Sequence, residues 1–385
     1  MAKLIDITGK ALAGEWGTDD ETGDGIPVLR TTNFTNEGVV NYKDVVTRTI
    51  TKKNIEDKFL RKGDIIIEKS GESDKFPVGR VIYFEGEEKT YLFNNFTGLL
   101  RVKNQDFWYP KYVFYSLFDN YKRGGTRAFE NKTTGLHNLK TDDYVTRYEV
   151  VETDKVEQIL ICDKLDKLYG VIKLREHELQ LLDDLIKARF VEMSSKWNVY
   201  KLPLSNFLDG ITYGFTNPMP DSNVGPWKIT AKDVVQGHVN YDTARKTTQE
   251  AYDMLTSKSK PNVGDVLLTK DGTLGRTAIV ENNNICVNQS VAVLRCNNNV
   301  LPRFLALLLQ LPEYQAEMTK NSGGGTIKHI YITKVDKMLV KIPDICSQKE
   351  YVRFVEQVDK SKVAVQKALN EAQQLFDSLM QEYFG

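Results

Sequence analysis

Cationic side chains beside glycines are the residues of this chain best suited to binding chemistry. Lys69-Ser70-Gly71 and Lys270-Asp271-Gly272 each follow a short apolar run. A cation next to a glycine turn can approach a phosphate or a base edge closely, because glycine leaves room for the backbone. Lys69, Ser70, Lys270 and Asp271 are therefore predicted to contact a nucleic acid. An ordinary surface loop remains the alternative for both tripeptides.

Two arginines occupy a similar place slightly further along the chain. Arg80 follows Gly79 and Arg276 follows Gly275, each at the start of an apolar run. The planar guanidinium group presents a fork of donors that suits guanine or phosphate, so both arginines are candidate contact residues. A structural salt bridge is the alternative for each.

Glycine-rich segments carry a third set of polar side chains. They extend over 124–139 and 321–330. Glycine admits close approach, and Thr, Asn, Lys and His offer donors and acceptors to a polar polymer, although a flexible linker is the alternative. The candidates here are Arg127, Lys132, Thr134 and Asn138 in the first segment and Thr326, Lys328 and His329 in the second. Two segments that match more weakly, 25–34 and 225–230, add Thr31, Asn33 and Thr230.

These candidates come in pairs because the chain is duplicated. Gly63-Asp64 and its apolar strand return as Gly264-Asp265, and Asn94-Asn95 returns as Asn288-Gln289. The separation between copies is 201 residues at Asp64 and 194 at Asn94. Order and spacing persist apart from loop-sized deletions, and so long a period indicates two globular units, each with its own core. In both copies short β-branched runs are punctuated by glycines, which predicts a β-rich globule.

A long charged segment with an apolar seam follows each globule. Apolar residues at alternating three- and four-residue steps are typical of a coiled coil. A helix of that length with one seam is not stable alone, so the two are expected to pair antiparallel and to separate the globules. The predicted seam residues are Leu165, Leu168, Ile172, Leu179, Leu182 and Ile186 in the first helix and Phe354, Val358, Val365, Leu375 and Leu379 in the second, with the small Ala368 and Ala372 allowing close packing.

Bulk composition describes an ordinary water-soluble chain. Of 385 residues, 41% are hydrophobic and 27% charged, and the 52 basic and 52 acidic side chains cancel. That balance argues against non-specific coating of nucleic acid, but it allows basic loops on one face. Four cysteines without paired spacing, and no long apolar run, favour a reduced, cytoplasmic protein without a membrane association.

Catalytic signatures are missing from the sequence. It contains no phosphate-binding GxxxxGK[ST] loop, no GxGxxG and no GxSxG elbow. The four histidines show no metal-ligand spacing. We therefore expect a binding protein without catalytic residues, metal or cofactor of its own.

The ordered set of motifs resembles a known family. Gly25-Ile26-Pro27-Val28-Leu29-Arg30-Thr31-Thr32-Asn33-Phe34, the Gly-Asp strand with its Lys-Ser-Gly or Lys-Asp-Gly end, the Asn-Gln strand, the glycine-rich loop and the long helix are similar to those of specificity (S) subunits of Type I restriction-modification systems. The resemblance covers essentially the whole chain. It implies an α+β fold with two pseudo-symmetric target-recognition domains, 1–150 and 197–342, and two conserved antiparallel helices, 151–196 and 343–385.

The same resemblance implies function and partners. Each recognition domain would read one half of a split, asymmetric sequence in double-stranded DNA, with half-site centres roughly 10 base pairs apart if both face one side of the duplex. The helices would set the spacer and dock two modification (M) subunits, which carry S-adenosylmethionine and the adenine N6-methylation chemistry. Restriction (R) subunits would add translocation and cleavage driven by ATP and magnesium.

One motif departs from the family, and two rival interpretations remain. The segment before the second helix contains Pro343, whereas 150–155 before the first helix has no proline. This departure bears on the symmetry of the two docking surfaces and not on the family resemblance. The rivals are a recognition subunit of a methylation-only system and a two-headed scaffold for a protein or carbohydrate ligand. The neutral net charge favours the scaffold, and an affinity that does not fall with added salt would support it.

Overall fold

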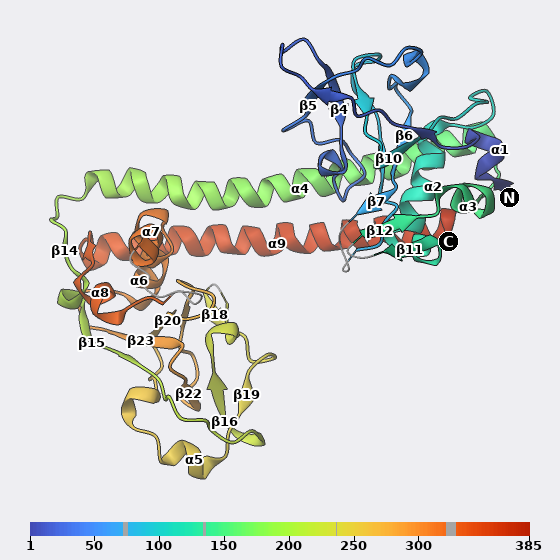
Figure 1. Ribbon diagram of the computed structural model, residues 1–385. Coiled ribbons are helices and arrows are strands. Elements are labelled where there is room, and N and C mark those ends of the chain that lie inside the picture. The colour runs from blue at the N-terminus through green and yellow to red at the C-terminus, as the bar shows by residue number, and fades with distance from the viewer. Residues whose placement is uncertain (72–75, 134–135, 236, 321–328) are drawn as a thin grey trace. The chain divides into compact units, whose positions relative to one another are not determined.

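The chain forms two compact units in the computed structural model (Figure 1). Unit 1 comprises 1–176 and 367–385, and unit 2 comprises 177–366. The structure describes residues 1–71, 76–133, 136–235, 237–320 and 329–385, with only the backbone of Lys132 and Thr133. Each long helix contributes to both units, so the units do not divide the chain at the predicted domain boundaries of 150, 196 and 342.

A four-stranded antiparallel sheet forms the centre of unit 1, in the order β2-β10-β6-β8. Its strands are β2 (Leu12–Ala13), β6 (Ile65–Glu68), β8 (Val81–Tyr83) and β10 (Thr97–Leu100). β6 is buried along its whole length because both faces are covered. Ile65 and Ile67 face the core shared with the helices, whereas Ile66 faces a second core with Phe84 and Phe93.

Smaller sheets and helices complete unit 1. A second sheet has the order β3-β5-β4-β9, in which β4 pairs parallel with β9, and β12 lies between β11 and β7. The remaining elements are β1 (Ala2–Lys3), α1 (Leu4–Thr8), β3 (Thr18–Asp19), β4 (Ile26–Leu29), β5 (Val46–Thr49), β7 (Ser70–Gly71), β9 (Leu92–Phe93), α2 (Pro110–Lys122), β11 (Glu130–Thr133), β12 (Leu136–Leu139), α3 (Thr141–Arg147) and β13 (Glu149–Val150).

Unit 2 repeats this arrangement. Its central sheet has the equivalent order β15-β23-β20-β21, and β16 pairs parallel with β22 as β4 does with β9. Its elements are β14 (Leu202–Pro203), β15 (Leu208–Tyr213), β16 (Ser222–Ile229), β17 (Val234–Val235), β18 (His238–Val239), β19 (Arg245–Lys246), α5 (Gln249–Asp253), β20 (Val266–Thr269), β21 (Thr277–Ile279), β22 (Ile285–Val287), β23 (Val291–Cys296), α6 (Pro302–Leu309), α7 (Pro312–Lys320), α8 (Ile332–Lys337) and β24 (Leu339–Val340).

Two glycines mark the same tight junction in both copies. A Cβ atom on Gly14 would lie 2.1 Å from the carbonyl oxygen of Asn94, and one on Gly214 would lie 1.7 Å from that of Val287. Both positions therefore require glycine, because a side chain would displace the neighbouring backbone.

The two long helices are α4 (Lys155–Lys196) and α9 (Ile345–Phe384), green and red in Figure 1. Within unit 1, the ring of Tyr169 lies 6.5 Å from that of Phe376, and the Lys164 ammonium donates to the Tyr383 hydroxyl at 3.3 Å. Because the residue number rises on one helix as it falls on the other, they run antiparallel there. Unit 2 has the same pattern, with Arg189–Glu350 and Asp183–Lys362 ion pairs. The expected α+β fold, two β-rich units with two long antiparallel helices, is confirmed.

Most residues of the predicted seam are buried or partly buried, and one is exposed. Leu165, Ile172, Val358 and Val365 are buried, and the other predicted residues except Leu375 are partly buried, namely Leu168, Leu179, Leu182, Ile186, Phe354 and Leu379. Leu375 is 52% exposed, whereas its neighbour Phe376 is 7% exposed and contacts the rings of Tyr115 and Tyr169. The seam takes a four-residue step from Ala372 to Phe376 here, because the aromatic rings of unit 1 select the larger side chain.

Both helices begin with the same buried glutamine. Gln158 and Gln348 are each 0% exposed. Gln158 Nε2 donates to the main-chain oxygens of Phe107 and Thr153, at 3.2 and 2.9 Å. Gln348 Nε2 donates to those of Asn299 and Pro343, at 2.9 and 2.7 Å. Thr153 thus takes the place of Pro343, and the hydrogen bonding at the helix start is equivalent in the two copies.

Candidate nucleic-acid interface

The ends of β6 and β20 bring the predicted segments together in both copies. The main-chain oxygen of Lys69 accepts a hydrogen bond from Leu139 N at 2.8 Å, and that of Lys270 accepts one from Ile330 N at 2.8 Å. The lysine-bearing strand end therefore lies beside the residues that follow the glycine-rich loop. This is the register that the Leu139/Ile330 match predicts.

Side chains at this junction differ in charge between the copies. In unit 1 the Ser70 hydroxyl donates to Asn138 Oδ1 at 2.6 Å, a neutral pair. In unit 2 the equivalent residues are Asp271 and His329, and the Asp271 carboxylate bonds His329 Nδ1 while pairing with the Lys270 ammonium at 2.9 Å. One backbone arrangement thus presents different donors and acceptors in the two units.

Arg80 is partly buried in unit 1 and belongs to an ion pair. Its guanidinium donates to Glu68 Oε1 at 3.3 Å and to the main-chain oxygens of Phe34 and Thr31, at 3.1 and 3.0 Å. Glu68 is buried, and this burial raises the pKa of its carboxyl despite the arginine. Arg80 therefore ties the 3₁₀ turn η1 (Thr31–Asn33) to the central sheet, as the salt-bridge alternative predicts.

Arg276 occupies the equivalent backbone position in unit 2 with a different environment. The Glu68 N–H bonds the Arg80 carbonyl at 2.8 Å, and the Thr269 N–H bonds the Arg276 carbonyl at 2.9 Å. Thr269 thus replaces Glu68, and Arg276 is exposed. Within the described ranges, no carboxylate pairs with its guanidinium.

Two further candidates stabilise turns. Asn33 is 1% exposed, and its amide bonds main-chain atoms of Arg30, Asn41 and Lys43. The Thr230 hydroxyl donates to Asp233 at 2.7 Å in the matching 3₁₀ turn η5 (Ala231–Asp233). The amide of Asn33 and the hydroxyl donor of Thr230 are therefore used within the protein.

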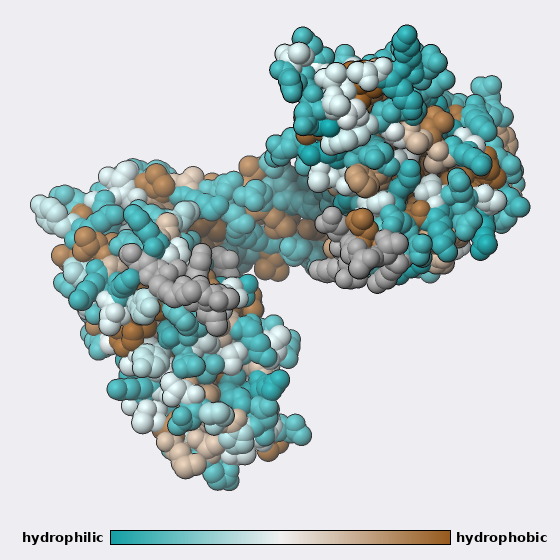
Figure 2. Space-filling model, in the orientation of Figure 1, coloured by the Kyte–Doolittle hydropathy of each residue, from teal (hydrophilic) through white to brown (hydrophobic). Residues whose placement is uncertain are grey.

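A cavity of about 660 Å³ in unit 1 collects several of these residues. Its lining includes Thr31, Ser70 and Arg80 together with the half-exposed rings of Phe76 and Phe96. Aromatic faces beside polar groups suit a ligand with flat rings and hydrogen-bonding edges. Figure 2 shows hydrophilic side chains over most of the visible face of each unit, with hydrophobic ones scattered among them.

Comparison with known proteins identifies the relatives. Residues 221–373 match a protein-family model described as Type I restriction modification DNA specificity domain. The specificity subunit of the Type I restriction enzyme EcoBI from Escherichia coli is 26% identical over 259 residues, covering 58% of this chain and 54% of that subunit. The chain is similar to Type I specificity subunits. In this match it spans about half the length of the EcoBI subunit.

Other Type I specificity subunits match over more of the chain. The EcoKI specificity subunit of Escherichia coli K12 is 22% identical over 398 residues, covering 93% of this chain and 80% of that subunit. The fold is also that of solved structures. A chain from a study of the assembly and conformational transition of a Type I system has a TM-score of 0.61 at 16% identity, covering 100% of this chain and 96% of its own length. The Type I S subunit from M. genitalium has a TM-score of 0.56 at 14% identity, with 100% and 95% covered.

Some predicted residues lie outside what the structure describes. Thr134, Thr326 and Lys328 fall in the undescribed segments, as does the side chain of Lys132. Arg127 is exposed in the 3₁₀ helix η3 (Gly125–Phe129). Among the described residues, no group of three or more His, Cys, Asp or Glu side chains could hold a metal ion. No helix in the described ranges is long and apolar enough to cross a membrane.

Sequence reasoning missed the acidic residues that form ion pairs with arginines of the central sheets. Asp64 pairs with Arg101 through two bonds of 2.6 and 2.7 Å, and Asp265 pairs with Arg295 in the same way at 2.9 and 3.1 Å. The repeated Gly-Asp and the repeated arginine were the available signals, and they mark scaffold. Glu68 gave no such signal, because its counterpart is a threonine.

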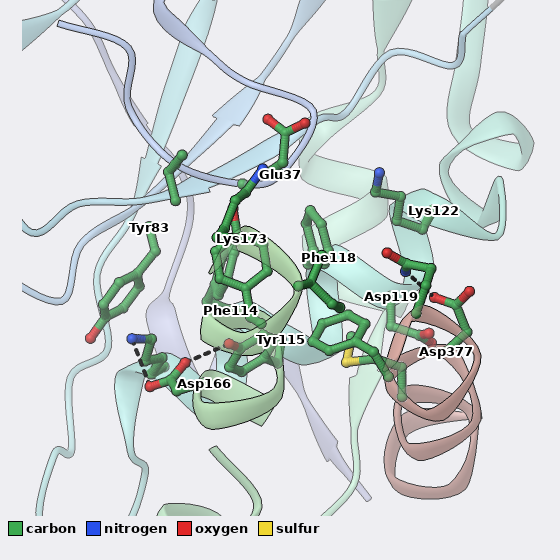
Figure 3. A pocket seen from close by; sticks show the side chains of 18 of the residues that line it. Glu37, Tyr83, Phe114, Tyr115, Phe118, Asp119, Lys122, Asp166, Lys173 and Asp377 are labelled. Atoms are coloured by element: carbon green, nitrogen blue, oxygen red, sulfur yellow. Dashed lines mark hydrogen bonds and ion pairs between the residues drawn. The ribbon is translucent and has the colours of Figure 1, made fainter. Parts of the chain in front are cut away.

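A second cavity of unit 1, about 670 Å³, was also not predicted. It is lined by α2, α4 and α9, and none of the predicted DNA contacts borders it. Figure 3 shows the rings of Phe114, Tyr115 and Phe118 close together, with Asp166 bonded to Tyr115 and to a lysine. That lysine is Lys111, whose ammonium lies 2.9 Å from the Asp166 carboxylate. Aromatic and charged side chains together line this cavity beside the helices.

Proposed function

We propose that this chain is the sequence-specific DNA-binding subunit of a Type I restriction-modification complex. Each β-rich unit would read one half of a bipartite, asymmetric target in double-stranded DNA. The observation that carries the proposal is the equivalent junction of the two units, Ser70–Asn138 in one and Asp271–His329 in the other. A common scaffold with different polar groups at one place is what two readers of different sequences require.

Reading would occur from the grooves of the duplex. The major groove distinguishes all four base pairs by their donors and acceptors, so loop side chains entering it can specify sequence. Cations on the same face would fix the register on the phosphates. The neutral net charge is compatible with this, since 52 acidic residues balance the cations across the whole surface and not at each loop.

The helices would dock the modification subunits. On α4, apolar residues at positions separated by one or three helical turns remain exposed, namely Val156, Leu160, Val171 and Leu174. Such a stripe favours an apolar partner surface, and two M subunits are the partners we assign to the helices. Those subunits would hold S-adenosylmethionine and methylate adenine at N6 after flipping the base out of the stack. R subunits would supply ATP- and magnesium-dependent cleavage, all in the cytoplasm.

The test is a methylation map. The chain is co-expressed with an M-type partner, and N6-methyladenine is located across host DNA by single-molecule sequencing. We expect a split motif, one half of which changes when residues 1–150 are replaced by those of another specificity subunit, and the other half when 197–342 are replaced. Methylation without a bipartite motif, or an affinity that does not fall with added salt, would favour the protein- or carbohydrate-binding scaffold instead.

A further inference from the structure

Four cations occupy two shared positions, one pair at the strand end and one pair at the start of the next strand. The strand-end pair is Lys69 and Lys270, and the second pair is Arg80 and Arg276. Their backbone hydrogen bonds are equivalent in the two units. Their side chains, however, have opposite environments.

In unit 1 the arginine is neutralised and the lysine is not. Arg80 bonds the buried Glu68 carboxylate and two main-chain oxygens. The Lys69 ammonium reaches only the main-chain oxygen of Asn95, at 3.5 Å, and pairs with no carboxylate in the described part of the chain. Of these two residues in unit 1, Lys69 therefore carries the positive charge that no described carboxylate neutralises.

In unit 2 the assignment is reversed. The Lys270 ammonium pairs with Asp271 at 2.9 Å, lies 5.5 Å from the centre of the Tyr213 ring, and is mostly buried. Arg276 is exposed, and no described carboxylate pairs with it. The uncompensated charge is therefore on Arg276.

The position of one acidic residue accounts for the reversal. Unit 1 has Glu68 where unit 2 has Thr269, and unit 2 has Asp271 where unit 1 has Ser70. These positions flank the lysine, the first at the end of β6 or β20 and the second two residues further along the chain. An acid at the first position engages the arginine, and an acid at the second engages the lysine.

We propose that Lys69 in unit 1 and Arg276 in unit 2 are the cations that contact DNA, whereas Arg80 and Lys270 are positioning residues. The inference rests on the proposed function, because it concerns how each unit reads its half-site. The ligand of Arg276 is a pair of acceptors matching its fork, offered by a guanine edge or by a phosphate. Lys69, a compact point charge, contacts phosphate.

The experiment compares single alanine variants in the complex with the M-type partner. Affinity for a duplex carrying the mapped motif is measured against salt concentration, together with the methylated motif and the melting temperature. Lys69→Ala is expected to lower the salt slope by about one without changing the motif. Arg276→Ala is expected to weaken binding about tenfold or more at unchanged melting temperature. A guanine contact would relax one position of the unit 2 half-motif, whereas a phosphate contact would lower the slope and leave the motif intact.

Matched controls come from the last residues of two equivalent helices. Arg147 on α3 and Lys337 on α8 are exposed, and Arg147→Ala and Lys337→Ala each remove one charge elsewhere in the same unit. We expect smaller effects on the salt slope than from Lys69→Ala. Arg80→Ala should lower the melting temperature, and Arg80→Lys should restore part of it.

Asp271→Asn should change DNA affinity, which a purely structural role of the Lys270–Asp271 pair would not do. Releasing Lys270 and removing a negative charge should raise affinity for any duplex several-fold and steepen the salt slope. The inference is overturned if Arg276→Ala binds like the parent complex, or if Arg80→Ala alters the motif at unchanged melting temperature. Failure of the proposed function is distinct, because the parent complex would then show no bipartite motif.

Discussion

The side-chain oxygen of Gln158 accepts a hydrogen bond from the backbone nitrogen of Tyr109 at 2.8 Å. Gln348 does the same for Leu301, also at 2.8 Å. Each buried amide therefore bonds one donor and two acceptors of the globule that precedes its helix. This clamp fixes where each long helix leaves its globule.

Replacing either glutamine by alanine should destabilise the corresponding unit. The change leaves one buried N–H and two carbonyl groups without partners, which costs about 1–3 kcal/mol. Urea unfolding of Gln158→Ala and Gln348→Ala checks this, with a change at an exposed glutamine of α9, Gln357→Ala, as the control. Equal stability of all three variants would mean that water replaces the amide.

Alanine at Gly14 or Gly214 should destabilise the fold by about 1–3 kcal/mol or more, because the Cβ atom would overlap a main-chain oxygen. Gly170 on α4 is the matched control, since nothing lies within 4 Å of its added Cβ. Gly170→Ala is expected to keep or raise the melting temperature. A Gly14→Ala variant that melts with the parent protein would contradict the close approach.

Substitution of Phe376 and Leu375 tests the seam of α9. Phe376→Ala removes a buried ring and should cost about 3–5 kcal/mol, whereas Leu375→Ala changes an exposed side chain and should stay within about 0.5 kcal/mol. Denaturant midpoints measure both. A larger loss of stability from Leu375→Ala than from Phe376→Ala would support the seam position that the sequence predicts.

Glu68→Gln should change how stability depends on pH. Burial raises the folded-state pKa of this carboxyl above its ordinary value of 4.5, so the folded protein binds the proton more tightly than the unfolded chain. The stabilising contribution of the Glu68 carboxyl is then fully present below about pH 4.5 and is lost as the pH rises through its folded-state pKa. Urea midpoints from about pH 4 to about pH 8 should show a shallower decline in the variant than in the parent. An identical slope would mean that Glu68 has no raised pKa.

Thiol labelling should separate the cysteines. Cys286 is buried, and burial raises its pKa to about 12, so little thiolate forms near neutral pH. Cys346 is exposed. Mass spectrometry after iodoacetamide treatment should find Cys346 labelled first and Cys286 labelled only with denaturant.

The duplicated scaffold could be predicted from the sequence because its order is fixed by backbone pairing. The matches at Lys69/Lys270 and Leu139/Ile330 correspond to equivalent hydrogen bonds, and loop deletions between them leave those bonds intact. Apolar strands and amphipathic helices can be recognised from the periodicity of their hydrophobic residues.

The ion pair of Arg80 and the bond between Asp271 and His329 could not be predicted, since the partners are distant along the chain, whereas Lys270 and its partner Asp271 are adjacent. Glu68 and Arg80 are 12 residues apart, and Asp271 and His329 are 58 apart. They meet only through sheet pairing. The seam at Leu375 was missed for a similar reason, because the rings of Tyr115 and Tyr169 decide which side chain faces inward.

The glutamine clamp has a consequence for how such proteins evolve. Gln158 bonds only main-chain atoms of Tyr109, Phe107 and Thr153, and Gln348 bonds those of Leu301, Asn299 and Pro343. None of the three side chains is the same in the two copies, yet the geometry is kept. Genes that recombine at the helix start would join unrelated globules to the same helix without disturbing the join. Under the proposed function, one crossover there would give a new pair of half-sites without a series of compensating point mutations.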